Sequence, residues 1–206
     1  MIYILTGGPA TGKGTRSDIL AEALNIPHIS TGEILREVSK TNEDMAARLS
    51  RGELISDEII TELLEERITR DDCKKGFILD GYPRTLNQVT LLDELLKKHG
   101  RSITKVVELT APDELVYRRI LERRQCEKCG RMYGIDFPPA VEDVCDDCGG
   151  HLAVRTDDTK ETLKARIETY KENSKDILNH YKEVGLLMSV DSSGHPERIV
   201  EEVANA

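Results

Sequence analysis

Residues 2–15 read Ile-Tyr-Ile-Leu-Thr-Gly-Gly-Pro-Ala-Thr-Gly-Lys-Gly-Thr, an apolar run that passes directly into a glycine-rich segment. Such a short apolar run is typical of a strand that is buried on both faces of a parallel sheet. The segment from Gly7 to Thr15 follows the phosphate-loop pattern G-x-x-x-x-G-K-[ST] with one departure. Gly14 stands where the pattern has Ser or Thr, and the hydroxyl comes one position later, at Thr15.

The chemistry of this segment suits a bound phosphate group. Glycines let the backbone wrap around an anion with its N–H groups pointing inward, and the following helix adds the positive end of its dipole. Lys13 supplies a mobile positive charge for the outer phosphates of a nucleoside triphosphate. A glycine-rich turn with an exposed lysine is the alternative. It is disfavoured because the segment follows a strand and opens a helix, as the motif requires.

The rest of the chain alternates apolar runs with segments of helical periodicity. Strands are predicted over 27–30, 76–80, 105–110 and 186–191, and helices over 13–24, 56–69, 85–98, 161–183 and 196–203. This alternation predicts an α/β fold, a P-loop three-layer architecture with a central parallel five-stranded sheet.

The sequence predicts two local features of these helices, an apolar stripe and a capping box. The first helix has Ile19, Leu20, Ala23 and Leu24 as its predicted inner stripe. A further helix is expected to begin at Ser30, because Glu33 stands three residues later and completes the pattern of a capping box.

The segment 125–156 interrupts the alternation, because it is rich in Cys, Gly, Pro and Asp and has no helical period. We expect an inserted subdomain there, between two parts of a core domain over 1–124 and 157–206. The segment holds two Cys-x-x-Cys pairs, the spacing of a structural zinc site, and its ligands would be Cys126, Cys129, Cys145 and Cys148. Iron in the same tetrahedral site, or unpaired or disulfide-bonded cysteines, are the alternatives.

Asp80 ends an apolar strand and is followed at once by Gly81-Tyr82-Pro83-Arg84. An acid in that place is costly unless it faces a cleft, and ligands of open α/β sheets bind at this edge. Asp80 is therefore a candidate for holding Mg²⁺ through water, because Mg²⁺ keeps much of its hydration shell, with a helix-capping role as the alternative. The five histidines have no pairing in the sequence that indicates acid–base catalysis, and Cys73 is expected to be a packing residue.

Composition limits the possible partners. The net charge of −9 disfavours a nucleic-acid binder, which usually has a basic excess. No apolar stretch approaches the roughly 20 residues that span a bilayer, and the first residues lack the basic region of a signal peptide. We expect a cytoplasmic protein.

Four motifs occur in the order that is found in adenylate kinases, and the chain resembles this family over essentially its whole length. They are Gly-x-Pro-x-x-Gly-Lys-Gly-Thr (7–15), Ser-Thr-Gly-Glu-Ile-Leu-Arg (30–36), Asp-Gly-Tyr-Pro-Arg-Thr (80–85) and Arg-Thr-Asp-Asp (155–158). The Lys-Gly-Thr ending of the loop is the family's own form, and 125–156 is similar to the lid of its long members. The resemblance implies a monomer that converts ATP and AMP into two ADP with Mg²⁺, with an AMP-binding helical region at about 30–59.

The resemblance also implies roles for individual residues. ATP would be held by Ala10, Thr11, Gly12, Lys13, Gly14, Thr15, Arg119, Arg123, Met132, Tyr133 and Gly194. AMP would be held by Thr31, Arg36, Glu53, Leu54, Ile55, Gly81, Tyr82, Pro83, Arg84, Gln88, Arg155 and Arg166, with Gln88 reading the adenine edge. The catalytic charges would be Lys13, Arg84, Arg123, Arg155 and Arg166.

Three other functions stay open on the sequence. A kinase for UMP or CMP would share the motifs. A zinc-ribbon module that binds nucleic acid or protein is disfavoured by the acidic residues of 126–150, which would repel a phosphate backbone. An inactive nucleotide sensor is disfavoured because Lys13 and the arginines are retained.

Overall fold

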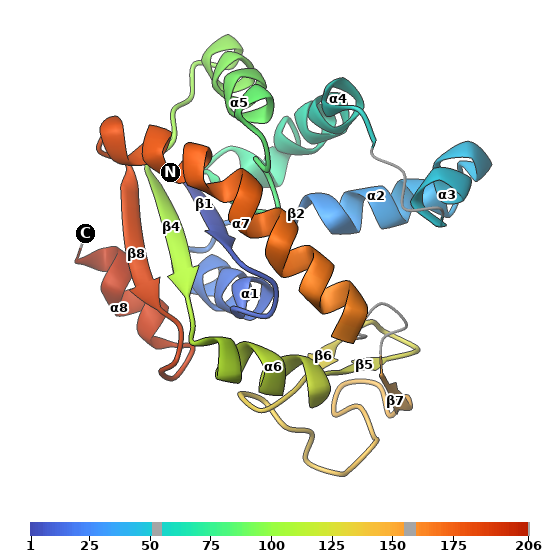
Figure 1. The fold of residues 1–206 in the computed structure, drawn as a ribbon. Coiled ribbons are helices and arrows are strands. Elements are labelled where there is room, and N and C mark those ends of the chain that lie inside the picture. Colours follow the sequence, from blue (N-terminus) through green and yellow to red (C-terminus); the bar gives the residue numbers. More distant parts are fainter. Residues whose placement is uncertain (51–54, 155–159, 206) are drawn as a thin grey trace.

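The computed structural model describes residues 1–50, 55–154 and 160–205, and its centre is a parallel sheet of five strands in the order β2-β3-β1-β4-β8 (Figure 1). The strands are β1 (Ile2–Gly7), β2 (His28–Ser30), β3 (Phe77–Asp80), β4 (Lys105–Thr110) and β8 (Leu187–Asp191). The predicted fold is thus confirmed. β1 is the middle strand, with β2 and β3, which come next in the chain, on one side and the later strands β4 and β8 on the other. The end of β1 is therefore next to the point where the strand order reverses, which is where such sheets bind ligands.

Helices cover both faces of this sheet, as parallel strands require. They are α1 (Lys13–Leu24), α4 (Asp57–Ile68), α5 (Leu86–Lys98), α7 (Lys160–Glu183) and α8 (Arg198–Ala204). Because successive side chains of a strand point to opposite faces, β1 contributes to two clusters. Ile2 and Ile4 pack with residues of α4, α5 and α7, whereas Tyr3 and Leu5 pack with residues of α1 and α8.

Three further α-helices and a short 3-10 helix complete the part that surrounds the sheet. α2 (Thr31–Ser39) packs against α3 (Glu43–Ser50) and α4, and together they extend to one side of the sheet (Figure 1). α6 (Asp113–Leu121) follows β4, and a short 3-10 helix (Asp71–Cys73) leads towards β3. Cys73 has none of its surface exposed and lies in the cluster under α4 and α5. None of the described helices is both long and apolar enough to cross a bilayer.

Two local predictions were confirmed only in part. Ile19, Leu20 and Leu24 of the predicted stripe of α1 pack in one core cluster, but Ala23 is exposed, and the buried face also includes Arg16, Ser17 and Ala21. α1 buries polar side chains because it lies against a C-terminal loop as well as against the sheet. α2 does have Ser30 as its N-cap residue, but the Ser30 side chain makes no capping hydrogen bond.

A second, smaller sheet stands between α6 and α7 in the chain. Its three strands are antiparallel in the order β6-β5-β7, with β5 at Arg124–Cys126, β6 at Met132–Tyr133 and β7 at Leu152–Ala153. Among the described residues of 125–154 none is helical. The core of this part is a separate cluster that is formed by Cys126, Tyr133, Cys145 and Leu152.

Candidate nucleotide and metal sites

The phosphate loop joins β1 to α1 at the carboxyl edge of the sheet. Gly12, in a left-handed conformation with φ 82°, is the N-cap residue of α1. Because glycine has no side chain, the first N–H groups of the helix are not capped by this residue. The ammonium of Lys13 folds back over the loop and donates hydrogen bonds to the carbonyl oxygens of Gly7 and Gly8, both at 2.8 Å. Thr11 closes the turn through a bond from its hydroxyl to the Gly8 carbonyl, at 2.9 Å. The loop, Lys13 and the helix N-terminus thus concentrate positive charge in one place.

The fold requires glycine at one position of the loop but not at another. A Cβ on Gly12 would lie 2.3 Å from Nη1 of Arg16, so the guanidinium leaves no space for a side chain. At Gly14, by contrast, a Cβ would meet no other protein atom within 4 Å. The fold therefore does not itself require glycine at position 14.

Asp80 lies at the same edge, between the two strands that carry the predicted nucleotide sites. It pairs in register with Leu5 of β1 on one side and with Ser30 of β2 on the other. Its carboxylate is 3.8 Å from Nε2 of His28, whose Nδ1 is 2.7 Å from the carboxylate of Asp18.

These contacts charge the ring of His28. Although burial alone would lower it, the carboxylates of Asp18 and Asp80 raise the pKa of His28 to about 9. The sequence gives no pairing of the five histidines that indicates acid–base catalysis, and the contacts of His28 with Asp18 and Asp80 became visible only in the structure. Sequence spacing could not reveal the contact, because Asp80 belongs to a strand that comes much later in the chain.

A second group of cationic and polar side chains gathers where β2 and β3 end. A Cβ on Gly81 would lie 3.0 Å from the hydroxyl oxygen of Thr31 and 3.1 Å from Nη2 of Arg84. Arg36 folds back along α2, so that its Nη1 lies 3.4 Å from the Cβ position of Gly32. The structure thus brings Thr31, Arg36 and Arg84 to one region, and Arg36 and Arg84 are both exposed there.

Gln88 is held in a fixed orientation beside this group. Its Oε1 accepts a hydrogen bond from the backbone N–H of Arg84 at 2.6 Å, and its Nε2 donates to Oδ1 of Asp57 at 2.7 Å. Asp57 also accepts bonds from Asn87 and Thr85. Sequence reasoning did not identify Asp57, which is the first residue of α4.

The remaining predicted AMP residues are only partly described. Ile55 and Tyr82 are buried, and the Tyr82 hydroxyl is 2.8 Å from the hydroxyl of Thr61. Pro83, like Tyr82, lies between β3 and α5. Glu53, Leu54 and Arg155 lie outside the described residues, and so does the side chain of Arg166 on α7.

The predicted ATP residues beyond the phosphate loop come from α6, the small sheet and the loop after β8. Arg119 is 7% exposed, donates from Nη2 to the carbonyl of Ser192 at 2.7 Å, and pairs with Asp136 at 2.9 Å. Arg123 follows the end of α6, and its Cα lies 4.0 Å from the Cβ position of Gly134.

The small sheet contributes Met132 and Tyr133. Tyr133 points into the cysteine cluster, where its hydroxyl donates to the Cys145 sulfur at 3.4 Å. Its side chain is therefore occupied within the small sheet, whereas Met132 is half-buried.

Four cysteine sulfurs form a compact group in the small sheet. The sulfurs of Cys126, Cys129, Cys145 and Cys148 all lie within 4.8 Å of one another. The Cys126–Cys148 and Cys129–Cys145 pairs are 3.5 and 3.6 Å apart, far longer than a disulfide. Sulfurs that bind one zinc ion tetrahedrally are separated by about 3.8 Å, so the donor set fits zinc.

The backbone around the sulfurs supports the same conclusion. Gly130 and Gly149 have positive φ, 80° and 65°, and close the two turns. N–H groups of the residues that follow Cys126 and Cys145 hydrogen-bond to these two sulfurs. The Tyr133 hydroxyl is the largest influence on Cys145, and together these donors lower the pKa of the Cys145 thiol to about 6. The lowered pKa values of Cys126 and Cys145 favour the thiolate, which is the form that binds metal, whereas the pKa values of Cys129 and Cys148 are raised.

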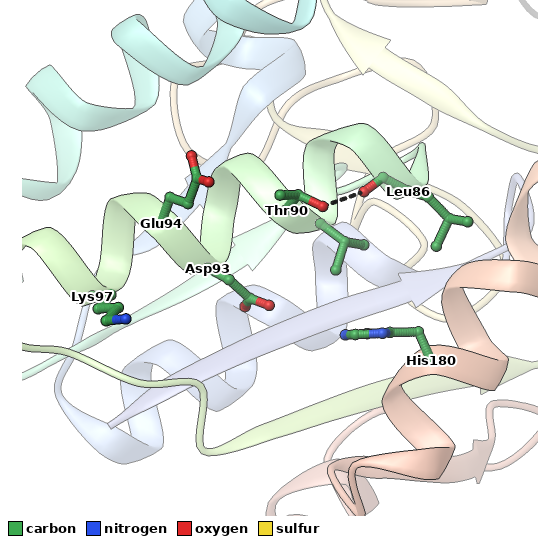
Figure 2. Close-up of a pocket in the computed structure, with 7 residues that line it drawn as sticks. Leu86, Thr90, Asp93, Glu94, Lys97 and His180 are labelled. Atoms are coloured by element: carbon green, nitrogen blue, oxygen red, sulfur yellow. Dashed lines mark hydrogen bonds between the residues drawn. The ribbon is translucent and has the colours of Figure 1, made fainter.

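A groove between α5 and α7 lies apart from these sites. It has a volume of about 450 Å³ and shares no residue with the predicted sites. Figure 2 shows His180 of α7 directed across it towards Asp93 of α5. Its lining combines acidic, basic and apolar groups: Leu86, Val89, Thr90, Asp93, Glu94, Lys97 and His180.

The five-stranded parallel sheet, with its phosphate loop at the strand reversal, is that of a P-loop kinase. A family model described as adenylate kinase matches residues 5–186 of the chain. The chain is also similar to proteins named adenylate kinase from three organisms. The protein of Caldicellulosiruptor bescii is 42% identical over 193 residues, with 91% of this chain and 90% of that protein covered.

The other two relatives are covered almost completely. The protein of Thermosipho melanesiensis is 40% identical over 210 residues, covering 100% of this chain and 98% of its own length. That of Archaeoglobus fulgidus is 39% identical over 208 residues, covering 98% and 96%. The chain belongs to the adenylate kinase family, and it is accordingly an enzyme, a nucleotide-binding transferase of the kinase class.

Proposed function

We propose that the enzyme transfers the terminal phosphoryl group of ATP to AMP, giving two ADP. The observation that carries this proposal is the place of Asp80 between two anion-binding groups. On one side of Asp80, β1 continues into the phosphate loop. On the other side, β2 continues into the helix that carries Thr31 and Arg36. A donor on the loop and an acceptor beside Thr31, Arg36 and Arg84 would meet in front of Asp80. The names of the relatives support the same pair of nucleotides.

The chemistry needs alignment and positive charge more than proton transfer. The attacking atom of AMP is a phosphate oxygen that is already anionic near neutral pH, so no general base is required. Lys13 would leave the carbonyls of Gly7 and Gly8 for the transferring phosphoryl group, and Arg84 would hold the acceptor phosphate. Arg123, Arg155 and Arg166 are proposed to neutralise the charge that develops between the two phosphate chains.

Mg²⁺ and zinc would have separate tasks. Mg²⁺ would supply charge neutralisation on the ATP phosphates, and Asp80 would hold its water shell at the carboxyl edge. The four cysteines would bind zinc with no open position, which makes that metal structural. The segment 125–156 is then a lid whose internal shape is fixed while it closes over ATP and excludes water.

Gln88 is proposed to select adenine in the acceptor site. A purine with a 6-amino group and an unprotonated N1 is matched by a side-chain amide, which has both a donor and an acceptor. A kinase for UMP or CMP is the competing assignment. Turnover with AMP, GMP, CMP and UMP, each with ATP as donor, tests it. We expect a clear preference for AMP, and a preference for any other acceptor would overturn the assignment.

We also infer that the enzyme acts as a monomer in the cytoplasm. The resemblance to adenylate kinases implies a monomer, and the cluster of four free cysteines suits a reducing compartment. Light scattering during gel filtration would show a mass close to the 23.1 kDa of one chain, and a stable dimer would contradict this inference.

A further inference from the structure

Arg16 is a buried arginine that the phosphate-loop motif does not account for. It lies on the first turns of α1, three residues after Lys13, and only 2% of its surface is exposed. Its Nη2 donates to two carbonyl oxygens at the far end of the chain, those of Ser192 at 2.7 Å and Gly194 at 2.9 Å. The guanidinium thus connects the helix of the phosphate loop to the loop that follows β8.

The same loop is anchored from other directions. The Ser192 backbone N–H and its hydroxyl both bond to the Thr110 carbonyl, each at 2.8 Å. Arg119 donates to the Ser192 carbonyl at 2.7 Å, so two guanidiniums share one acceptor. Ser192 is completely buried. The backbone of residues 192–194 is therefore held at several points.

Two buried arginines side by side are unfavourable unless something compensates them. Burial and the charge of Arg119 both lower the pKa of Arg16. Asp136 pairs with Arg119, and no carboxylate is paired with Arg16 among the described residues. Nη1 of Arg16 and Nε of Arg119 are buried with no hydrogen-bond partner in the described part of the chain. Burying two guanidiniums beside each other, next to the helix that follows the phosphate loop, costs free energy of folding. Such a buried and incompletely paired group indicates a function beyond packing.

We propose that Arg16 is a positioning residue for the base of ATP, because its two bonds fix the carbonyls of Ser192 and Gly194. The inference rests on the proposed function and on the ATP-holding role that the family resemblance implies for Gly194, which we take to be a backbone contact with the base. A carbonyl oxygen has two lone pairs, so Gly194 can accept from Arg16 and from the 6-amino group of adenine together. Inosine triphosphate has a 6-oxo group, which cannot donate to the same carbonyl.

The test measures binding of three probes by calorimetry, with the full-length enzyme: ATP, inosine triphosphate and inorganic tripolyphosphate. In Arg16→Met we expect ATP to bind about tenfold more weakly, as is typical when a charge-assisted hydrogen bond is lost. Tripolyphosphate has no base, so its affinity should change by less than about twofold. The preference for ATP over inosine triphosphate should decrease, and the KM for AMP should stay the same.

Two variants complete the experiment. Arg16→Lys keeps the charge and most of the volume but loses the planar fork that bridges two carbonyls, so its ATP affinity should remain reduced. This variant also keeps the test informative if the methionine variant does not fold. Arg118→Met removes an exposed arginine that neighbours Arg119 and pairs with Glu122, and it should bind all three probes as the wild type does.

Three results would overturn the positioning role of Arg16. They are an equal loss of affinity for ATP and tripolyphosphate, full recovery of ATP binding in Arg16→Lys, and no loss for ATP in either variant. Failure of the proposed function is a separate result, because the wild-type enzyme itself would then form no ADP from ATP and AMP.

Discussion

The side-chain amide of Gln88 donates a hydrogen bond from Nε2 to Oδ1 of Asp57, at a distance of 2.7 Å. Because the Arg84 N–H is bonded to the opposite end of the same amide, the two contacts together decide which way Gln88 faces. An amide side chain is nearly symmetric in shape, and only its hydrogen bonds distinguish the two orientations. Asp57 on α4 therefore determines how a residue at the start of α5 presents its donor and acceptor.

Replacing Asp57 with Ala should weaken the recognition of the acceptor base. Without its partner, Gln88 can rotate or flip, so we expect the KM for AMP to rise by about five- to tenfold, as for the loss of one hydrogen bond to a charged group. The ratio of AMP to GMP turnover should also decrease, while the KM for ATP should not change. Steady-state kinetics with both acceptors measures these effects.

Glu58→Ala is the matched control, because Glu58 is the adjacent acid of the same first turn and is exposed. It should have the acceptor preference of the wild type. Equal effects of the two substitutions would assign the loss to the helix terminus and not to the orientation of Gln88.

Gly14→Ala should separate stability from nucleotide binding. A Cβ at this position meets no protein atom within 4 Å, and alanine is favoured over glycine in a helix. The free energy of unfolding should therefore stay the same or increase by up to about 1 kcal/mol. ATP should nevertheless bind less tightly, because the methyl group lies in the proposed phosphate site. Denaturant unfolding and ATP titration of the same sample test both points, and unchanged ATP affinity would contradict this placement.

Removing the metal should destabilise the small sheet. The cluster of Cys126, Tyr133, Cys145 and Leu152 is too small to be stable by itself. We expect Cys145→Ser to abolish zinc binding and to lower the melting temperature of the enzyme, as chelation of the metal would. Metal analysis and calorimetry are the measurements.

Cys73→Ala is the control for this prediction, since Cys73 is buried under α4 and α5, away from the cluster. It should retain the full zinc content. If verified loss of zinc left the melting curve unchanged, the structural role of the metal would be wrong.

Asp136→Ala should destabilise the contact between the small sheet and α6. Arg119 is 7% exposed and would lose its ion-pair partner, at 2.9 Å. A buried charge without its partner costs several kcal/mol, but Asp136 is partly exposed, so we expect about 1–3 kcal/mol. The free energy of unfolding measured in urea should show this loss. Glu142 is an exposed acid in a turn between β6 and β7. Its substitution Glu142→Ala should change the free energy of unfolding by less than about 0.5 kcal/mol.

The sequence predicted the elements of this fold well, because periodicity and glycine position carry most of the information. The helix predicted over 13–24 is Lys13–Leu24, and the strand over 105–110 is Lys105–Thr110. The buried face of α1 was predicted only in part, for a physical reason. Ile19, Leu20 and Leu24 do pack inward, but the loop after β8 also needs hydrogen-bond donors, and Arg16 supplies them from the buried side.

The site was only partly predictable for a similar reason. The four cysteines were found because zinc ligands have a fixed local spacing, and their sulfurs do lie together. Three residues were not found, because each acts through a contact with a residue that is distant in the chain: Asp57 with Gln88, His28 with Asp80 and Arg16 with Ser192. Short sequence patterns do not predict such contacts.

We propose that one site of this enzyme transfers a phosphoryl group between two adenine nucleotides. The most direct measurement follows all adenine nucleotides by chromatography after the wild-type enzyme is mixed with ATP, AMP and Mg²⁺. We predict that two ADP form for each ATP consumed, that no inorganic phosphate is released, and that ATP is stable without AMP. Release of phosphate in place of ADP, or ATP consumption that does not depend on AMP, would contradict this account.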